Sequence, residues 1–328
     1  MNPYRRIHKF SLLLATCTLI LLTLGGLVHS TGSGLSVPDW PTTYGQNMFT
    51  YPVHEWTGGI KYEHGHRLFA SFVGFLMIVE LIWLWRIEKT ASTKFLRSIA
   101  VIALAAVCVQ GVLGGLTVLF QLPTAISASH GLLAQLFLIM TVLLTIATSD
   151  TWQNFSGSKA VIPASSRTLF AVTFAFTFVQ IFLGALTRHT YSGLAIPDFP
   201  LAFGKVIPDF SLYNYQVVIH YLHRVGAVLL SILSITQLVV IIRGGDAFAR
   251  LRKPMIAAVV LIAVQITLGG LIVLTVREVV PNTLHVTVGS LLLICHAITW
   301  FYSLKYFDTP ARSYQTVQVE NPSLDKLY

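Results

Sequence analysis

The stretch Glu63-His64-Gly65-His66-Arg67 guides the interpretation of this sequence, because a weaker copy, His220-Tyr221-Leu222-His223-Arg224, follows in the second half. Each stretch stands where a polar segment meets a long apolar run. A lone histidine begins another apolar run further along each half, His130 in the first and His285 in the second. Four histidines in two matched pairs predict a duplicated fold with one site in each copy.

The composition is that of a membrane protein. Of the 328 residues, 54% are hydrophobic and only 11% are charged, and the mean hydropathy is +0.70. A soluble domain has about a quarter of its residues charged, so we expect the lipid bilayer to be the main partner. The net charge of +9 follows membrane topology in its distribution, so nucleic acid is not an expected partner. All three cysteines lie in apolar runs, which leaves none for a disulfide in a loop.

Eight apolar runs are long enough to cross a bilayer core, which needs roughly 20 residues. Backbone polar groups must be satisfied inside the membrane and the alternating pattern of a barrel is absent, so the runs predict α-helices. The first run is longer than the core of a signal peptide and we expect it to be retained. The runs cover residues 10–28, 68–85, 98–119, 130–148, 168–186, 220–242, 255–275 and 284–303.

Lysine and arginine predict the orientation of these helices. Of the 22 basic residues, 16 fall in the segments on one side of the membrane. The positive-inside rule therefore places both termini in the cytoplasm (N-in, C-in) of a multi-pass protein of the plasma membrane. All four histidines of the matched pairs then lie toward the outer, periplasmic face.

Two further stretches repeat. Residues 33–41 (SGLSVPDWP) return as 192–200 (SGLAIPDFP), and residues 110–116 (QGVLGGL) return as 265–271 (QITLGGL). Four crossings bring the chain back to its starting side, so the halves share one topology and are expected to be related by a pseudo-twofold axis along the membrane normal. The predicted fold class is an all-α membrane protein with eight transmembrane helices in two four-helix bundles.

The repeat also sets the predicted domains. These are an N-terminal half, residues 1–150, a C-terminal half, residues 151–308, and a polar cytoplasmic tail, residues 309–328. Two long outer loops, residues 29–65 and 187–219, are rich in aromatic residues, proline and glycine. They have two interpretations, an aromatic belt at the membrane interface or a lid over a ligand held just below.

The histidine pairs predict that each half binds a heme group. In each half both histidines begin helices that descend from the outer face, so their side chains start at the same depth. A flat, apolar macrocycle between two such helices would receive one imidazole on each face of its iron. Arg67 and Arg224 follow the first histidine of each pair at the polar surface and suit the heme propionates. Zinc fits less well, because it needs four closely grouped ligands.

The other histidines have simpler explanations. A single histidine at a helix mouth is usually interfacial or hydrogen-bonded, and only the duplication favours iron ligation for the four above. His64 points away from His66 on a helix and is expected to be exposed in the loop. His296 has no histidine counterpart and is expected to be a hydrogen-bonded core residue. His29 and His189 are expected at the interface, with a channel or supporting role as the alternative.

The two halves differ in one acidic residue. Glu63 precedes His66 by three residues, on the same helical face, and His220 takes its place in the second half. A carboxylate beside only one of two heme sites predicts that this site carries out chemistry and that the other relays electrons. The alternative is that Glu63 is solvated or simply paired with Arg67.

As a set, these motifs resemble the heme A synthase family, the membrane enzymes of cytochrome oxidase assembly, over residues 10–303. The resemblance implies an oxidoreductase that converts the C8 methyl of heme O, its substrate, to the formyl group of heme A through successive hydroxylations. It also implies a heme b cofactor. Expected partners are the farnesyltransferase that makes heme O and an electron donor of quinol or ferredoxin type, and a homo-oligomer is compatible with the family.

The resemblance implies a role for each site residue. His66 and His130 would flank the iron of heme O in the N-terminal half, and His223 and His285 would ligate the iron of heme b in the C-terminal half. Glu63 would be the catalytic residue, as a general base toward water or as a stabiliser of positive charge on the oxidised carbon. Some members carry a cysteine pair in the first outer loop. This sequence has none there, so a thiol-dependent electron step is not implied.

Two other functions compete with this one. A di-heme electron carrier like cytochrome b would share every iron ligand but give Glu63 no task. A transporter built from repeats would need ionisable residues near the bilayer midplane. Apart from Glu80, which is expected to face the bundle or the inner interface, the apolar runs contain few such residues.

Overall fold

The computed structural model describes residues 4–156 and 159–309, and these form a nearly all-helical protein. Eight of its helices are long and apolar enough to cross a membrane, which confirms the predicted fold class and number of spans. These helices are α1 (Tyr4–Ser30), α2 (Ile60–Arg86), α3 (Ala91–Leu119), α4 (Thr124–Ala147), α6 (Ala164–His189), α7 (Tyr215–Arg243), α8 (Ala249–Leu274) and α9 (Val279–Tyr306). The short elements are α5 (Asp150–Gln153), the 3-10 turns Val53–Glu55, Ser192–Leu194, Phe210–Leu212 and Gly245–Phe248, and the strands β1 (Ala160–Val161) and β2 (Phe307–Asp308).

Several helices begin earlier than the apolar runs predict. Helix α2 starts at Ile60 and helix α7 at Tyr215. Hydropathy marks only the apolar part of a helix, whereas its first turn is polar and is fixed by capping. For α7, the Asn214 side chain accepts hydrogen bonds from the first backbone N–H groups. The histidines predicted at helix mouths therefore lie in the second or third turn of their helices, on regular backbone.

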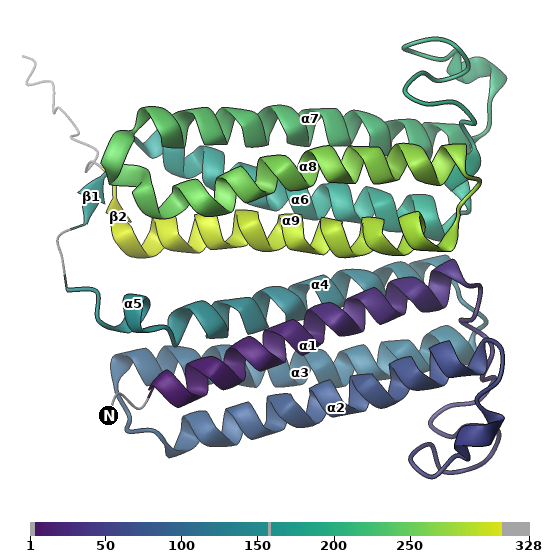
Figure 1. The fold of residues 1–328 in the computed structure, drawn as a ribbon, viewed down its shortest axis with the longest axis horizontal. Helices are drawn as coiled ribbons and strands as arrows, with labels where there is room; N and C mark the ends of the chain where they lie inside the picture. The colour runs from purple at the N-terminus through teal and green to yellow at the C-terminus, as the bar shows by residue number, and fades with distance from the viewer. Residues whose placement is uncertain (1–3, 157–158, 310–328) are drawn as a thin grey trace, which may run out of the picture.

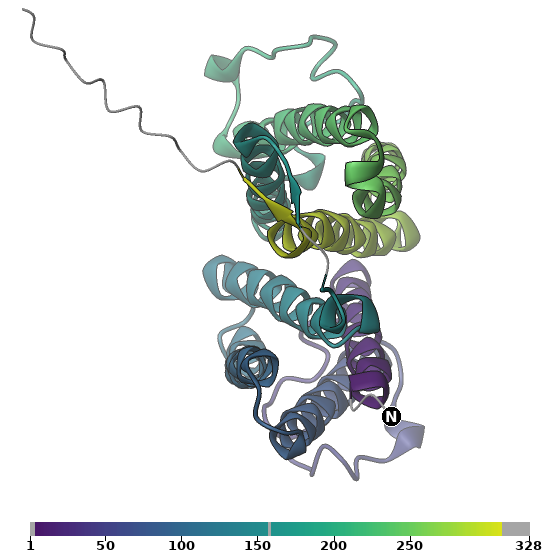
Figure 2. The same cartoon turned by 90° about the vertical axis from the view of Figure 1, so that its left-hand side faces the viewer.

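The helices form two groups of four, α1 to α4 and α6 to α9, as the end-on view in Figure 2 shows. The groups touch through α1 and α4 on one side and α6 and α9 on the other. Side chains also join them by hydrogen bonds, Thr23 to Thr287 at 3.0 Å and Gln135 to Ser290 at 2.9 Å. Helices α2, α3, α7 and α8 lie away from this junction.

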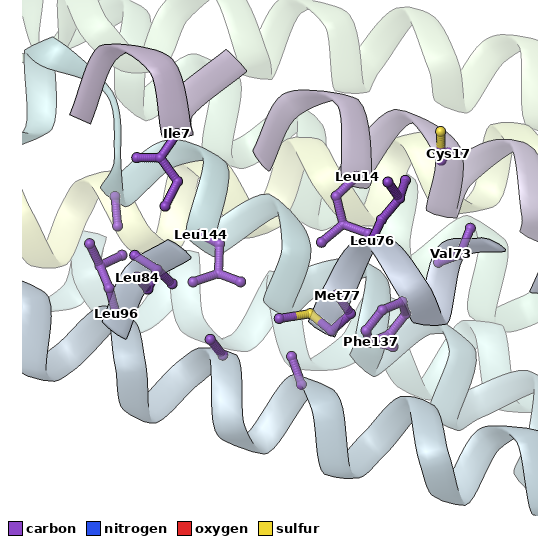
Figure 3. Packing of buried hydrophobic residues seen from close by; sticks show 13 residues of the cluster. Ile7, Leu14, Cys17, Val73, Leu76, Met77, Leu84, Leu96, Phe137 and Leu144 are labelled. Carbon is purple, nitrogen blue, oxygen red and sulfur yellow. The ribbon is translucent and has the colours of Figure 1, made fainter. Parts of the chain in front are cut away.

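Each group has its own apolar core. In the first, Leu14 of α1, Met77 of α2 and Phe137 of α4 are buried together, as Figure 3 shows. A second cluster around Phe170 and Met255 fills the other group. Since lipid is as apolar as these side chains, close packing rather than escape from water stabilises the helix contacts.

The described part of the chain begins and ends at the same end of the bundle (Figure 1). There, β1 pairs in parallel with β2, and Arg167 donates a hydrogen bond to the Phe307 carbonyl at 2.5 Å. The two long loops lie at the opposite end. The side of the membrane that each end faces, the pseudo-twofold axis and the domain boundaries stay predictions. Residues 310–328 of the predicted tail lie outside the described residues.

Candidate functional site

All four histidines of the matched pairs lie toward the loop end of their helices. His66 is in α2 and His130 in α4, while His223 is in α7 and His285 in α9. All four are half-buried. Each pair therefore takes one histidine from an outlying helix and one from a helix at the junction between the two groups.

Each of these rings packs against a glycine of a neighbouring helix. A Cβ atom added to Gly25, Gly114, Gly184 or Gly269 would lie 3.2, 3.1, 3.1 and 3.3 Å from the Cε1 atom of His66, His130, His223 and His285, in that order. These distances are tighter than ordinary van der Waals contact. The four glycines thus form four notches of similar depth, and each notch fixes the position of one imidazole ring.

We expect Gly114→Val to weaken heme binding by the first group. The added side chain would displace the His130 ring, and overpacking of this kind costs about 1–3 kcal/mol, or roughly tenfold to hundredfold in affinity. Gly111→Val is the matched control, because Gly111 lies on the same helix with nothing within 4 Å of an added Cβ. Heme O titration of the two purified variants, followed by absorption, measures the difference. Equal affinities would show that the notch does not position His130.

The spacing of His223 and His285 fits a shared iron. Their ring centroids are 6.3 Å apart, with 69° between the ring planes. Imidazole nitrogens bind transition metals at about 2 Å, so two rings on opposite sides of one metal ion have centroids about 6 Å apart. His66 and His130 are also electrostatic neighbours. Among the described residues, no three His, Cys, Asp or Glu side chains gather as a metal-ion cluster.

Glutamine side chains support three of the four histidines. Gln110 and Gln265 donate to the backbone carbonyls of His130 and His285, at 2.8 and 3.0 Å. Gln180 donates to the His223 carbonyl at 2.8 Å, and its amide lies 3.1 Å from the Nδ1 atom of that ring. The Nδ1 atoms of His66, His130 and His285 are buried without a partner. A ligating imidazole uses one nitrogen for the metal and offers the other to a neighbour. Of these four rings only that of His223 has such a neighbour at Nδ1, so the orphaned Nδ1 atoms do not themselves indicate ligation.

Glu63 anchors the first outer loop. This residue is only 4% exposed. One carboxylate oxygen accepts a hydrogen bond from Arg67 at 2.6 Å, and the other accepts one from the Val37 backbone N–H at 2.8 Å. The ion pair with Arg67 expected as the alternative is therefore present. It holds the carboxylate in place one turn before His66.

Arg67 is engaged with the same loop. It donates to the carbonyl oxygens of Asp39, Thr42 and Val37 at 2.7, 3.2 and 2.9 Å, besides its bond to Glu63. These four bonds occupy four of the five N–H groups of a guanidinium, and only Nε–H remains. A propionate contact for Arg67 stays a prediction limited to that one donor.

The second group repeats this anchor with a histidine. The Arg224 guanidinium donates to the Leu201 and Ile196 carbonyls at 2.8 and 3.2 Å, and its Nε lies 3.3 Å from His220 Nε2. The Ile196 backbone N–H lies 3.3 Å from His220 Nδ1. Since a neutral imidazole can accept only one of these two hydrogen bonds, His220 is a weaker anchor than Glu63. The propionate role of Arg224 stays a prediction.

Both loops turn in the same way above the histidines. Asp39 accepts from the Tyr44 and Gly45 N–H groups, and Asp198 accepts from the Phe203 and Gly204 N–H groups at matched positions. Hydrogen bonds from Gly204 and Phe203 lower the pKa of the Asp198 carboxyl. Burial raises the pKa of Asp39, but the hydrogen bonds from Thr42, Gly45 and Tyr44 outweigh it and lower the pKa. Both carboxylates are therefore charged at neutral pH and fix their turns.

The second glycine of each Gly-Gly repeat receives an aromatic ring from a loop. A Cβ atom at Gly115 would overlap the Trp40 ring, and one at Gly270 would overlap the Phe199 ring. The loops are thus held down on α3 and α8 as well as on α2 and α7. This arrangement favours the interpretation of the loops as lids, although the interfacial belt is compatible with it.

The structure corrects the prediction for His64. The residue is fully buried rather than exposed in a loop, because α2 begins before it. Its Nδ1 lies 3.1 Å from the Thr43 hydroxyl, and the Trp56 ring lies 4.6 Å away. His296 is confirmed as a hydrogen-bonded core residue, with Thr177 at 2.8 Å and Ser234 at 3.1 Å.

Three other polar residues need comment. The rings of His29 and His189 lie 5.5 Å apart, one from each group. Glu80 is fully buried, as expected for a residue that faces the bundle, and the Ser11 hydroxyl lies 2.5 Å from one of its oxygens. Of these residues, His189 is an electrostatic neighbour of His130 in the first pair.

Sequence reasoning missed the residues that support the histidines. Gly114 and Gln110 stand within a stretch quoted as a repeat, but no role followed from the repeat alone. Their spacing of four residues puts both on one helical face, and this was the signal available. Gly25 and Gly184 stand at matched places before the outer loops, and no role for Gly184 followed from the sequence.

Fold and site together define the class of this protein, a polytopic helical membrane protein with two pairs of histidines, each pair beneath an anchored loop. The family model described as cytochrome oxidase assembly protein matches residues 8–297. The heme A synthase of Halalkalibacterium halodurans is 30% identical over 299 residues, which are 90% of this chain and 97% of that protein. The chain belongs to the heme A synthase family of cytochrome oxidase assembly proteins, and the resemblance is confirmed.

Two other heme A synthases show a similar degree of identity to this chain. The heme A synthase of Shouchella clausii is 30% identical over 302 residues, 90% of this chain and 97% of its own length. That of Alkalihalophilus pseudofirmus is 32% identical over 241 residues, 72% of this chain and 76% of its own. The similarity thus spans both groups of helices rather than one.

Proposed function

We propose that this chain is a heme A synthase, an oxidoreductase that converts the C8 methyl of heme O to a formyl group. Family membership supports the proposal at the level of the reaction. One observation carries it at the level of the site. Two histidine pairs pack against matching glycines, but only one has a buried carboxylate, Glu63, where the other has His220.

Heme b is the proposed cofactor of the second group, with His223 and His285 as the iron ligands. The ring spacing of 6.3 Å supports this assignment. Bound there, heme b would supply one-electron redox chemistry between an external donor and the substrate site. Oxidation of a methyl to a formyl group with electrons from a donor would also need dioxygen as the oxidant. Gln180 and Gln265 would keep the two imidazoles in place.

Heme O is the proposed substrate of the first group, between His66 and His130. The glycine notches at Gly25 and Gly114 support equal positioning of these two rings. Arg67 would border the propionate edge through its remaining N–H group, and Arg224 has the same proposed role in the second group. His130 and His285 lie on helices of the junction, which suits transfer of electrons from one site to the other.

Glu63 is the proposed catalytic residue. Its carboxylate accepts hydrogen bonds from Arg67 and the Val37 backbone N–H and is also approached by the Ser36 backbone N–H, whereas a carboxylate has about four acceptor positions. The free positions can accept a proton from water, as a general base does, or face positive charge on the carbon being oxidised. In both roles Arg67 and Val37 fix the direction of the carboxylate.

The proposed setting is the plasma membrane, with the heme sites toward the periplasmic face. The two proposed partners are a farnesyltransferase that supplies heme O and a quinol or ferredoxin-like donor that supplies electrons.

Pigment extraction tests this proposal. Membranes of a host that supplies heme O but makes no heme A should yield heme A once the wild-type chain is present. An empty vector is the control for the host. If heme O persists unchanged while the purified protein contains heme, the chain is a di-heme electron carrier and the proposed reaction is wrong.

A further inference from the structure

Two arginines at the loop end have no anionic partner. Arg188 lies in the last turn of α6, and Arg277 lies in the turn between α8 and α9. Both are half-buried, and Arg277 is the charged neighbour that acts on Arg188. Within residues 4–156 and 159–309, neither guanidinium donates a hydrogen bond to a carboxylate or forms an ion pair. Two adjacent cations that are partly removed from water need an anion between them.

The fold itself does not require these cations. Val276 and Arg277 have positive φ angles of 55° and 67°, and Gln121 and Leu122 have nearly the same angles, 57° and 61°, in the corresponding turn. There the second position is Leu122, which packs near Gly34. The turn therefore forms equally well with an apolar side chain, and the arginine in the second group needs another reason.

Arg188, like Arg277, has no arginine at the matching position of the first group. Gly25 and Gly184 are matched positions, since each forms the notch for the first histidine of its pair. Four residues later stand His29 in the first group and Arg188 in the second. Both unpaired arginines thus belong to the second group only, which is the group with the proposed heme b.

The position of Arg188 connects it with that heme site, and Arg277 is connected with the site through Arg188. Arg188 is an electrostatic neighbour of the proposed iron ligand His285, and also of His29 and His189. These residues belong to both groups, so Arg188 faces the junction rather than the surrounding lipid. Arg224, the arginine expected to hold the propionates of this heme, is largely engaged by the Leu201 and Ile196 carbonyls and by His220.

We propose that Arg188 and Arg277 form a carboxylate-binding site for the propionates of the heme held by His223 and His285. The inference rests on the proposed heme b. A guanidinium binds a carboxylate through two parallel hydrogen bonds, and two heme propionates offer one carboxylate to each arginine. This site would set the rotation of the macrocycle about the axis through the two imidazoles, which ring ligation alone leaves free.

The test compares hemin with hemin dimethyl ester, which has no propionate charge. Wild-type protein stripped of heme should bind hemin more tightly than the ester. Arg188→Gln and Arg277→Gln should each lower hemin affinity, roughly tenfold to hundredfold from the strength of a charged hydrogen bond, and leave the affinity for the ester unchanged. Arg188→Lys retains the charge and should recover part of the loss. Lys205→Gln removes an exposed cation of the second loop and is the matched control.

The outcomes separate the two proposals. If wild type binds neither compound, the proposed heme site is wrong and this inference falls with it. If hemin binds but the arginine variants keep the wild-type ratio of hemin to ester affinity, only the inference is wrong. It is also overturned if the variants lose bound anionic phospholipid with no change in that ratio, because the arginines then bind lipid phosphate.

Discussion

Glu63→His is expected to lower heme A formation by at least about 100-fold, within the range of 10²–10⁴ that a positioned general base contributes. The second group of helices already shows that histidine fits at this place. There His220 lies within 3.3 Å of both Arg224 and the Ile196 N–H group. The substitution therefore keeps a hydrogen-bonding anchor for the loop while it removes the carboxylate.

Glu63→His separates the loss of a chemical role of the carboxylate from the loss of the loop anchor. Glu63→Ala would leave the half-buried Arg67 without its anion, and loss of one partner of a buried ion pair costs about 3–5 kcal/mol. Loss of activity in that variant would have two explanations. Heme A and heme O extracted from membranes, and the heme content of the purified protein, should be measured together for Glu63→His and Glu63→Gln. Undiminished heme A in Glu63→His would show that the carboxylate has no chemical role.

Replacement of His223 or His285 by alanine is expected to remove the b-type absorption bands of the purified, reduced protein. In the proposed site each imidazole would be a ligand of the heme iron, so the loss of either one is expected to weaken heme binding. His66→Ala and His130→Ala should keep these bands, because they affect only the first group.

His296→Gln is the matched control for the second group. His296 lies on the same helix as His285, is fully buried and is hydrogen-bonded to Thr177 and Ser234. The variant tests whether any disturbance of α9 removes the heme. If the bands vanish in His296→Gln but persist in His285→Ala, the iron ligands of the second group have been assigned wrongly.

Hydropathy and the repeat were sufficient to predict the eight spans. The composition of each run is decided by the bilayer, so the prediction needs no knowledge of tertiary contacts. The ends of the helices were less well predicted, because capping by residues such as Asn214 extends them into polar sequence. His64 was placed in an exposed loop for this reason, whereas the early start of α2 buries it between Thr43 and Trp56.

The sequence singled out the candidate residues of the site, but it did not predict the glycine and glutamine residues that hold them in position. The duplication singled out His66 and His223 because both precede an arginine. It could not indicate that Arg67 donates four hydrogen bonds to the first loop and to Glu63. Every residue has a backbone carbonyl, so the sequence does not show which carbonyls accept these bonds. The unpaired Arg188 looked like any cation at a membrane surface, and only tertiary contacts bring it near His285.

The number of hemes per chain tests the central claim most directly, that each group of helices holds one heme between its two histidines. Purified protein loaded with heme O and heme b should contain one of each per chain by pyridine hemochrome analysis. It should lose only heme O in His66→Ala and only heme b in His223→Ala. A spectrum without heme bands after loading, or a heme content that neither substitution changes, would contradict the account.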